Sequence, residues 1–132
     1  MATVKFLSPE WLDAVQKTVR ATIKPEAIDN ATTSILTVFE NIPGGGEKAL
    51  LTRIEKGIFT EIALVAEPYA KTEFAISGDY STYMKVFKGQ LDPTKALFGG
   101  DLSLKGNMLK AMGMVNVLTP FFSVLGGIPA EF

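Results

Sequence analysis

The sequence contains no cysteine and no histidine. Without cysteine the chain can form no disulfide, and it has no thiolate to act as a nucleophile or to hold zinc or an iron–sulfur cluster. Without histidine it has no imidazole base, no imidazole metal ligand and no Ser-His-Asp triad. Only carboxylate, lysine and tyrosine chemistry remains. These two absences favour binding over catalysis, and we expect neither a metal nor a cofactor.

An excess of charge of one sign is also missing. The chain has 13 basic and 14 acidic residues, for a net charge of −1. A nucleic-acid-binding domain usually concentrates basic residues on one face, whereas here they are scattered, with no run of five like charges. We therefore expect no nucleic-acid partner. Residues 1–10 lack a basic stretch followed by an apolar core, so no secretory signal is predicted and we expect a cytoplasmic protein.

The hydrophobic fraction of 47% is enough for one buried core, and no repeat, linker or low-complexity tract divides the chain. We expect residues 1–132 to form a single domain. The first helix opens at Ser8 and Pro9, which suit an N-cap and a first helical position. Its apolar residues then recur every four positions: Trp11, Val15, Val19 and Ile23.

Four short runs rich in β-branched and aromatic residues follow this helix. They predict an antiparallel meander with one face exposed to solvent. The residues expected on its covered face include Leu50, Thr52, Ile54, Ile58, Ile62 and Leu64. Beyond them we expect two short helices, a last strand and a C-terminal helical segment. The expected strands are 34–41, 49–56, 58–66, 72–77 and 102–105, and the two short helices are 80–87 and 93–97.

The C-terminal segment carries no charge between Lys110 and Glu131. A transmembrane span would need about twenty apolar residues, and polar residues interrupt this run. Two interpretations stay open. The run is an ordinary buried helix that completes the core, or it is a loosely packed lid over an apolar cavity. Flexible methionine side chains at 108, 112 and 114 support the lid, and Pro120 predicts a kink or break.

No residue pattern indicates catalysis. The carboxylates between Glu61 and Asp101 are spaced as strand exteriors and helix caps. The glycine-rich stretch 43–48 lacks the spacing of a phosphate-binding loop and is expected to be a hairpin loop. The aromatic stripe of the 80–87 helix is expected to face the core or a cavity, because stacking on bases would need a basic groove beside it.

The region from residue 78 to residue 112 carries a distinctive order of glycines, aromatic residues and turns. Its members are Gly78-Asp79-Tyr80, Tyr83, Val86-Phe87, Gly89, Leu91-Asp92-Pro93, Ala96, Gly100, Leu102-Ser103-Leu104-Lys105 and Gly106-Asn107-Met108. This order resembles the sterol carrier protein (type 2) domain, also called the non-specific lipid-transfer domain. That family has an aromatic helix ending in glycine, an Asp-Pro-x-x-Ala helix, and a glycine-flanked strand leading into Gly-Asn or Gly-Asp.

The resemblance implies an α+β fold with a five-stranded, mainly antiparallel sheet, helices packed on one face, and an apolar tunnel between sheet and helices. Family members bind sterols, fatty acids, fatty acyl-CoA or phospholipids without covalent chemistry, and the C-terminal segment often borders or gates the tunnel. It implies a lipid or fatty acyl ligand and transient contact with a membrane. The residues expected at the tunnel, with Gln90 supplying a polar group, are Tyr83, Phe87, Gln90, Leu97, Met108, Met112, Val115, Leu118, Phe122 and Leu125.

The resemblance leaves an alternative function open. The domain occurs in its family both alone and fused to enzymes, so the apolar segment 111–130 could instead form the interface of a homodimer. The protein would then be a dimerising or substrate-presenting accessory module. Eukaryotic members commonly end in a peroxisomal tripeptide, whereas this chain ends in Ala130-Glu131-Phe132, which agrees with the expected cytoplasmic location.

Overall fold

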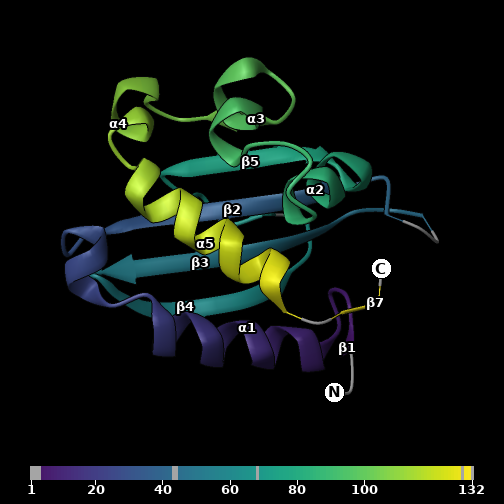
Figure 1. The fold of residues 1–132 in the computed structure, drawn as a ribbon, viewed down its shortest axis with the longest axis horizontal. Helices are drawn as coiled ribbons and strands as arrows, with labels where there is room; N and C mark the ends of the chain where they lie inside the picture. The colour runs from purple at the N-terminus through teal and green to yellow at the C-terminus, as the bar shows by residue number, and fades with distance from the viewer. Residues whose placement is uncertain (1–3, 43–44, 68, 129, 132) are drawn as a thin grey trace.

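The computed structural model describes residues 4–42, 45–67, 69–128 and 130–131. Helices lie on one face of a five-stranded sheet (Figure 1). The strands of that sheet are β2 (Thr33–Glu40), β3 (Lys48–Glu55), β4 (Ile58–Val65), β5 (Phe74–Asp79) and β6 (Ser103–Lys105). The helices are α1 (Pro9–Thr22), the 3₁₀ helix η1 (Pro25–Ile28), α2 (Tyr80–Phe87), α3 (Pro93–Gly99), α4 (Met108–Met112) and α5 (Val115–Gly127). The predicted α+β class is confirmed.

Local signals place the helix ends where the sequence predicts them. The Ser8 hydroxyl accepts a hydrogen bond from the Trp11 backbone N–H at 3.2 Å, and Pro9 is the first residue of α1. The Asp92 carboxylate caps α3 by accepting from the Thr94 N–H at 2.8 Å. The prediction that Asp92 is a helix cap is therefore confirmed.

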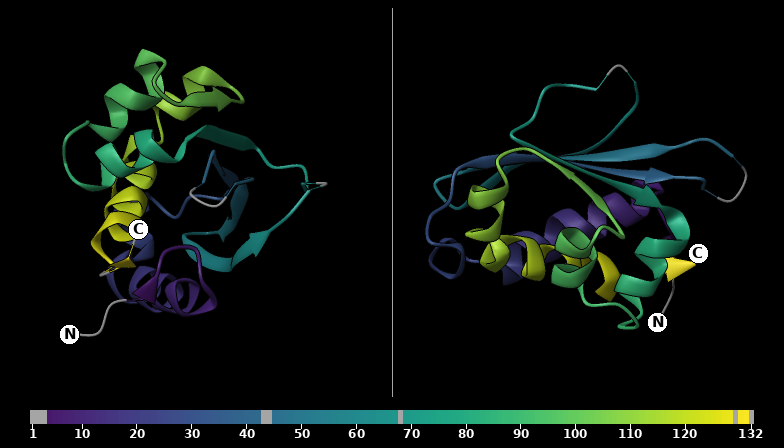
Figure 2. Two further views of the ribbon diagram at one scale, coloured as in Figure 1. Left: turned by 90° about the vertical axis from the view of Figure 1, so that its right-hand side faces the viewer. Right: turned by 90° about the horizontal axis from the view of Figure 1, so that it is seen from above.

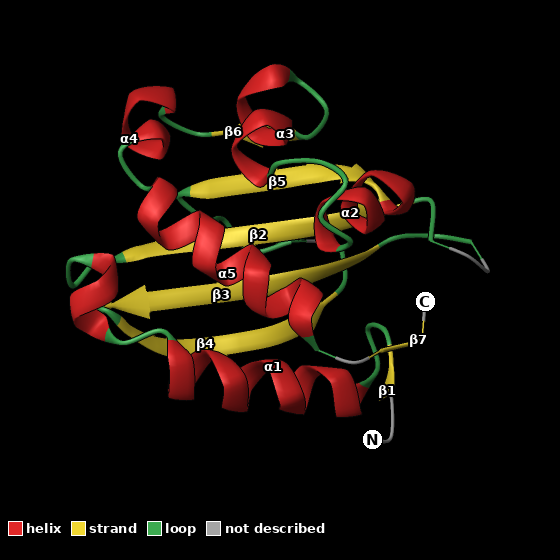
Figure 3. Ribbon diagram, viewed as in Figure 1, coloured by secondary structure: helices red, strands yellow, loops and turns green. Residues whose placement is uncertain are grey.

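The strand order corrects the predicted meander. The sheet is ordered β4-β3-β2-β5-β6, and β2 pairs antiparallel with β3 but parallel with β5. The sheet is therefore mixed, though mostly antiparallel, with helices on one face (Figure 3). A pattern of β-branched residues predicts a strand but carries no information on its partner, so the local sequence could not distinguish these orders.

The sequence predicted that one face of the sheet is exposed to solvent. In the structure, part of the face opposite the helices is covered instead. Leu36, Val38, Ala49 and Leu51 are buried there as a second, smaller cluster, against which Tyr69 packs. The connection that carries Tyr69 joins β4 to β5 and lies on this side of the sheet (Figure 2). The connection must cross the sheet because β3 and β2 lie between β4 and β5. The topology therefore supplies the cover that a meander would have lacked.

Ile58 was predicted to lie on the covered face of the sheet, and this prediction is wrong because β4 contains a bulge. Arg53 pairs with Glu61 and Ile54 with Phe59, so Thr60 is an extra residue in the ladder. One extra residue inverts the alternation of side chains along a strand. As a result Phe59 is buried with Ile54, and Ile58 is 59% exposed.

The ends of the described chain form an element that the sequence did not indicate. Strand β1 (Val4–Lys5) pairs in parallel with β7 (Ala130–Glu131). Only two residues of each strand are involved, which is too short for a recognisable pattern. The C-terminal segment also divides into α4 and α5. Because α5 continues through Pro120, the chain has no helix break at this residue, and a kink there stays a prediction. No helix of the described residues is long and apolar enough to span a bilayer.

Candidate functional site

Helix α5 is the central element of the helical layer. It crosses the sheet face diagonally and packs against α1, α2, α3 and η1 (Figure 1). Its interior side is fully apolar, with buried Val117, Leu118, Phe121, Phe122 and Leu125. This stripe accounts for the hydrophobic, uncharged C-terminal run, because the helix is enclosed by neighbours on several sides.

Aromatic side chains fill the space between α5 and the sheet. Phe121 stacks on Phe59 of β4 with ring centroids 6.2 Å apart. The ring centroid of Tyr83 in α2 lies 4.5 Å from that of Phe39 in β2 and 6.5 Å from that of Phe122. The predicted tunnel would run through this layer, so a ligand must displace or spread these rings to enter it. The tunnel itself stays a prediction.

The Tyr83 hydroxyl does not act as a base in this setting. It donates a hydrogen bond to the Ile76 carbonyl at 3.3 Å. Burial, and secondarily the charge of Glu40, raises the pKa of the Tyr83 phenol well above its ordinary value of 10.0. The group therefore remains neutral at physiological pH and contributes an aromatic surface.

Two grooves run along the C-terminal half of α5, one on each side. The first, of about 440 Å³, lies between α5 and the α2–α3 region and is lined by Val86, Phe87, Gly89, Pro93, Thr119, Phe122, Ser123, Gly126 and Gly127. The second, of about 350 Å³, lies between α5 and α1 and is lined by Thr18, Thr22, Ile23, Pro120, Ser123, Val124 and Gly127. Phe122 connects the first groove with the core, because it is buried yet contributes to the groove lining.

Gly126 sets the distance between α5 and α2. A Cβ at this position would lie 2.9 Å from the Cα and 3.0 Å from the Cβ of Phe87. Real side chains do not approach a backbone so closely, so the two helices can pack at this distance only around a glycine. This contact closes the inner side of the first groove.

The structure brings together some of the predicted site residues and separates others. Gln90, Met108 and Met112 are exposed, whereas Val115 is half-buried. The members that pack in the main core, or against it, are Tyr83, Phe87, Leu97, Leu118, Phe122 and Leu125. All ten remain predictions as ligand contacts, but the structure supplies a shared environment only for the second group.

Helix α4 presents apolar side chains outward. Only Ala111 is buried in this five-residue helix. The exposed fractions are 48% for Met108, 83% for Leu109 and 57% for Met112. We call these three side chains the α4 surface. Exposed apolar clusters of this kind mark contact sites more often than isolated exposed residues do.

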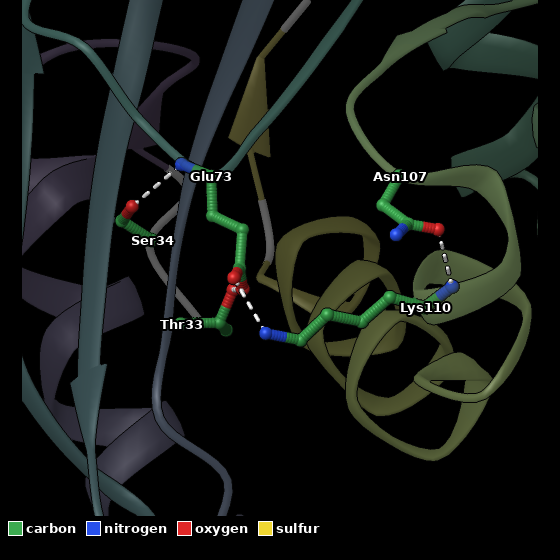
Figure 4. Close-up of polar contacts among 5 residues, drawn as sticks. All are labelled: Thr33, Ser34, Glu73, Asn107 and Lys110. Atoms are coloured by element: carbon green, nitrogen blue, oxygen red, sulfur yellow. Dashed lines mark hydrogen bonds and ion pairs between the residues drawn. The ribbon is translucent and has the colours of Figure 1, made fainter.

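A polar cluster around Glu73 attaches α4 to the sheet (Figure 4). The Glu73 carboxylate accepts a hydrogen bond from Thr33 and forms an ion pair with Lys110, each at 2.5 Å, and the Glu73 N–H donates to Ser34 at 2.8 Å. Burial acts to raise the pKa of Glu73, but the Lys110 and Thr33 hydrogen bonds and the Lys110 charge hold it below 4.5. The pair spans 37 residues of sequence, a separation at which local patterns carry no signal.

Three buried polar atoms lack a hydrogen-bond partner among the described residues: Trp11 Nε1, Thr37 Oγ1 and Thr52 Oγ1. Leaving such a group unpaired in the interior costs roughly 1–3 kcal/mol. The strand pattern predicted Thr52 on the covered face but indicated no role for it, and Thr37 was not predicted as a site residue. The sequence signal that could have identified both threonines is their position: each alternates with apolar residues on the covered face of a strand.

Acidic residues provide no metal site in the described part of the chain, where no three Asp or Glu side chains gather closely enough to hold an ion. The buried polar residues of the described chain are Thr33, Thr37 and Thr52, and none of these is charged. The interior can therefore receive apolar groups and neutral polar groups, but it offers no counter-ion.

Comparison with known proteins agrees with this arrangement. The family model described as the SCP-2 sterol transfer family matches residues 46–119. No curated protein sequence matches the chain.

Solved structures resemble most of the chain. A crystal structure of sterol carrier protein 2 matches with a TM-score of 0.78 and 21% identity, covering 92% of this chain and 97% of that one. A conserved hypothetical protein of Thermus thermophilus, described as possibly a sterol carrier protein, matches with a TM-score of 0.77 and 20% identity over 99% and 94%. Palmitated SCP2L2 from Aedes aegypti matches with a TM-score of 0.61 and 13% identity over 85% and 95%. At these identities the likeness establishes the fold alone.

Proposed function

Because the chain belongs to the SCP-2 sterol transfer family, we propose that it binds one lipid molecule beneath α5 and transfers it between membranes without chemical change. The ligand class comprises fatty acids, fatty acyl-CoA, phospholipids and sterol-like molecules. The Aedes aegypti protein of the same fold is named as palmitated, which supports an acyl chain. The protein is expected to act in the cytoplasm.

The observation that carries this proposal is α5 itself, an uncharged helix between two grooves whose inner side forms the roof of an aromatic core. A hydrocarbon chain that replaces side-chain contacts in this layer leaves water at about 0.8 kcal/mol per methylene. About ten buried methylenes therefore suffice for micromolar affinity before ordering costs. No nucleophile, base or metal is needed, which agrees with the absence of cysteine and histidine.

Helix α5 also acts as the gate. It is connected to the sheet through α4, whose Lys110 pairs with Glu73, and to η1 through a hydrogen bond of 2.9 Å from Asn116 to Asp29. Its other contacts are apolar and non-directional, so the helix can shift without breaking a ladder of the five-stranded sheet. Uptake then opens the boundary between α5 and α2, where the first groove lies.

The proposal is tested by displacement of a fluorescent fatty acid from the purified protein, with native mass spectrometry of the same sample. We expect saturable displacement at one ligand per chain. Leu118→Trp should weaken binding about tenfold or more, because overpacking a buried position removes space for the ligand. Ile58→Trp is the matched control, since Ile58 is 59% exposed and is not among the predicted ligand contacts, and its binding should be unchanged. Absence of any probe binding by folded wild-type protein would refute the proposal.

The α4 surface supports a second step, contact with the membrane from which the lipid is taken. Residues 102–128 contain no acidic residue, and Lys105 is exposed three residues before α4, which suits anionic headgroups. Three side chains are too few for the roughly 800 Å² that each partner of a stable dimer buries. We therefore assign the surface to a lipid bilayer and treat the dimerising module as the competing outcome.

Vesicle sedimentation distinguishes these two outcomes. Wild-type protein should pellet weakly with vesicles of phosphatidylcholine and phosphatidylglycerol, and Leu109→Asp should reduce the bound fraction about tenfold, because the leucine side chain can no longer leave water. Ile58→Asp on β4 is the matched control, because it adds the same charge at an exposed apolar position outside the α4 surface, and it should pellet like wild type. A constant dimer mass without vesicle binding would instead support the accessory module.

A further inference from the structure

Thr37 and Thr52 lie on the face of the sheet that the helices cover. On β2, Thr37 alternates in phase with Ile35 and Phe39, which belong to the main core. On β3, Thr52 alternates with Leu50 and Ile54, which belong to the same core. Since side chains two residues apart share a face of a strand, both threonine side chains lie on the face that packs in the main core, beneath the helical layer.

The two threonines are neighbours on adjacent strands. Thr37 pairs with Leu50, and Thr52 pairs with Ile35, so the threonines occupy diagonal positions across the β2–β3 ladder. Diagonal neighbours on one face are separated by roughly 7–8 Å between Cα atoms, and less between side chains. A ligand lying across this pair of strands can reach both hydroxyls with one or two oxygens.

Burial makes these hydroxyls unusual. Both residues have no exposed surface, and neither hydroxyl has a partner among the described residues. Thr33 lies on the same strand and the same face, and its hydroxyl donates to Glu73. The contrast is informative, because a buried hydroxyl normally finds a partner, and the Thr37 and Thr52 hydroxyls have none among the described residues.

We infer that Thr37 and Thr52 form a polar subsite that binds a neutral oxygen of the carried lipid, a hydroxyl or carbonyl group on an otherwise hydrocarbon ligand. A hydroxyl can donate to a carbonyl and can both donate to and accept from an alcohol. The inference rests on the proposed function, and it deepens it by assigning the inner end of the ligand and the residues that recognise it.

The absence of charge in the described core decides against an ionic headgroup at this position. A carboxylate or phosphate taken into the interior would need a paired cation, and the buried polar residues of the described chain are all threonines. A fatty acid or phospholipid would thus bind with its headgroup toward a groove. Long-chain alcohols and ketones are predicted to bind with the oxygen inward.

The test is a competition assay in which a fluorescent fatty acid is displaced by an alkane, a primary alcohol and a methyl ketone of equal chain length. Wild-type protein should prefer the alcohol and the ketone over the alkane. The double variant Thr37→Val/Thr52→Val keeps the shape of both side chains and should lose about tenfold of that preference, with little change for the alkane. A preference for the alcohol but not the ketone would show that the hydroxyl group of the ligand donates a hydrogen bond to the threonines.

Three controls separate recognition from structure. Thr33→Val removes a hydroxyl that already has a partner and should leave the alcohol-to-alkane ratio unchanged. Thr37→Ser and Thr52→Ser retain the hydroxyls and should retain the preference. Thermal melting checks that the valine variant is folded, which we expect because valine favours strands.

The outcomes distinguish this inference from the proposed function. An unchanged alcohol-to-alkane ratio in a folded valine variant that still binds the probe overturns the threonine subsite and leaves lipid carriage intact. Loss of all probe binding by wild-type protein overturns both. Equal loss of affinity for alkane and alcohol in the valine variant would also overturn the inference, because packing and not hydrogen bonding would then be responsible.

Discussion

The sheet and the C-terminal helices α4 and α5 are held by different kinds of contact. Strands β2 to β6 are joined by ladders of backbone hydrogen bonds, interrupted by one bulge in β4, and these bonds are directional. Helix α5 is held mainly by apolar packing on α1, α2 and α3, with Asn116 and Asp29 joined near its start. Apolar contacts can be redistributed around a ligand, whereas a ladder cannot. This difference confines the proposed gate to the helical layer.

Phe121 tests whether α5 is nevertheless a full part of the core. The side chain is almost fully buried and stacks on Phe59 of the sheet. Phe121→Ala should lower the free energy of unfolding by about 3–5 kcal/mol, through lost burial and the cavity left behind. Denaturant unfolding measures this loss, with the half-buried Val124→Ala in the same helix as the smaller-effect control. A loss below about 1 kcal/mol would show that α5 is already loosely held.

Gly126 tests the boundary between α5 and α2. In Gly126→Ala the new methyl would lie 2.9 Å from the Phe87 Cα, so the helices must separate. We expect a loss of about 1–2 kcal/mol in the free energy of unfolding and faster uptake of a fluorescent fatty acid. Gly127→Ala is the matched control, because a Cβ added there would meet no atom within 4 Å. Identical uptake rates in the two variants would contradict opening at this boundary.

Glu73 tests the attachment of α4 to the sheet and should have the smallest effect. Its pKa is lower in the folded chain than its ordinary value of 4.5, so the attachment stabilises the fold above that pH. The contribution is lost as the pH falls below 4.5 through the lowered pKa. Melting temperatures of wild type and Glu73→Gln should differ slightly at pH 7 and converge in acid, since an exposed pair contributes under about 1 kcal/mol.

The Lys110→Gln variant checks that the effect belongs to the pair. It should lower the melting temperature at pH 7 by about the same amount as Glu73→Gln, and the double variant should lower it little further. A melting-temperature difference that persists unchanged into acid would mean that the Glu73 carboxylate is not responsible.

Short-range patterns predicted most elements of this fold. Ser8-Pro9 and Asp92-Pro93 mark helix starts because a cap and a proline act within a single turn. Strand pairing was not predictable in the same way. Thr60 inserts into the ladder and inverts Ile58, and a bulge depends on the partner strand as well as on its own sequence.

The candidate site was also predicted only in part, because some of its features depend on a single helix and others on how the helices pack. Periodic apolar positions such as Leu118, Phe122 and Leu125 are buried as a stripe because one helix determines their common face. Met108 and Met112 are apolar too, but they are exposed. They lie in α4, a separate short helix of which only Ala111 is buried. Composition identified an apolar region, but it could not distinguish the inner surface from the outer one.

The sequence by itself determined what chemistry this protein lacks, where its helices begin and that its C-terminal run is apolar. These are properties of single residues and of neighbours within a turn. Only the tertiary structure decided that β5 pairs with β2, that Lys110 meets Glu73, and that Thr37 and Thr52 lie at diagonal positions on the covered face of the sheet. Such contacts join residues far apart in the chain, and the packing of the whole chain selects them.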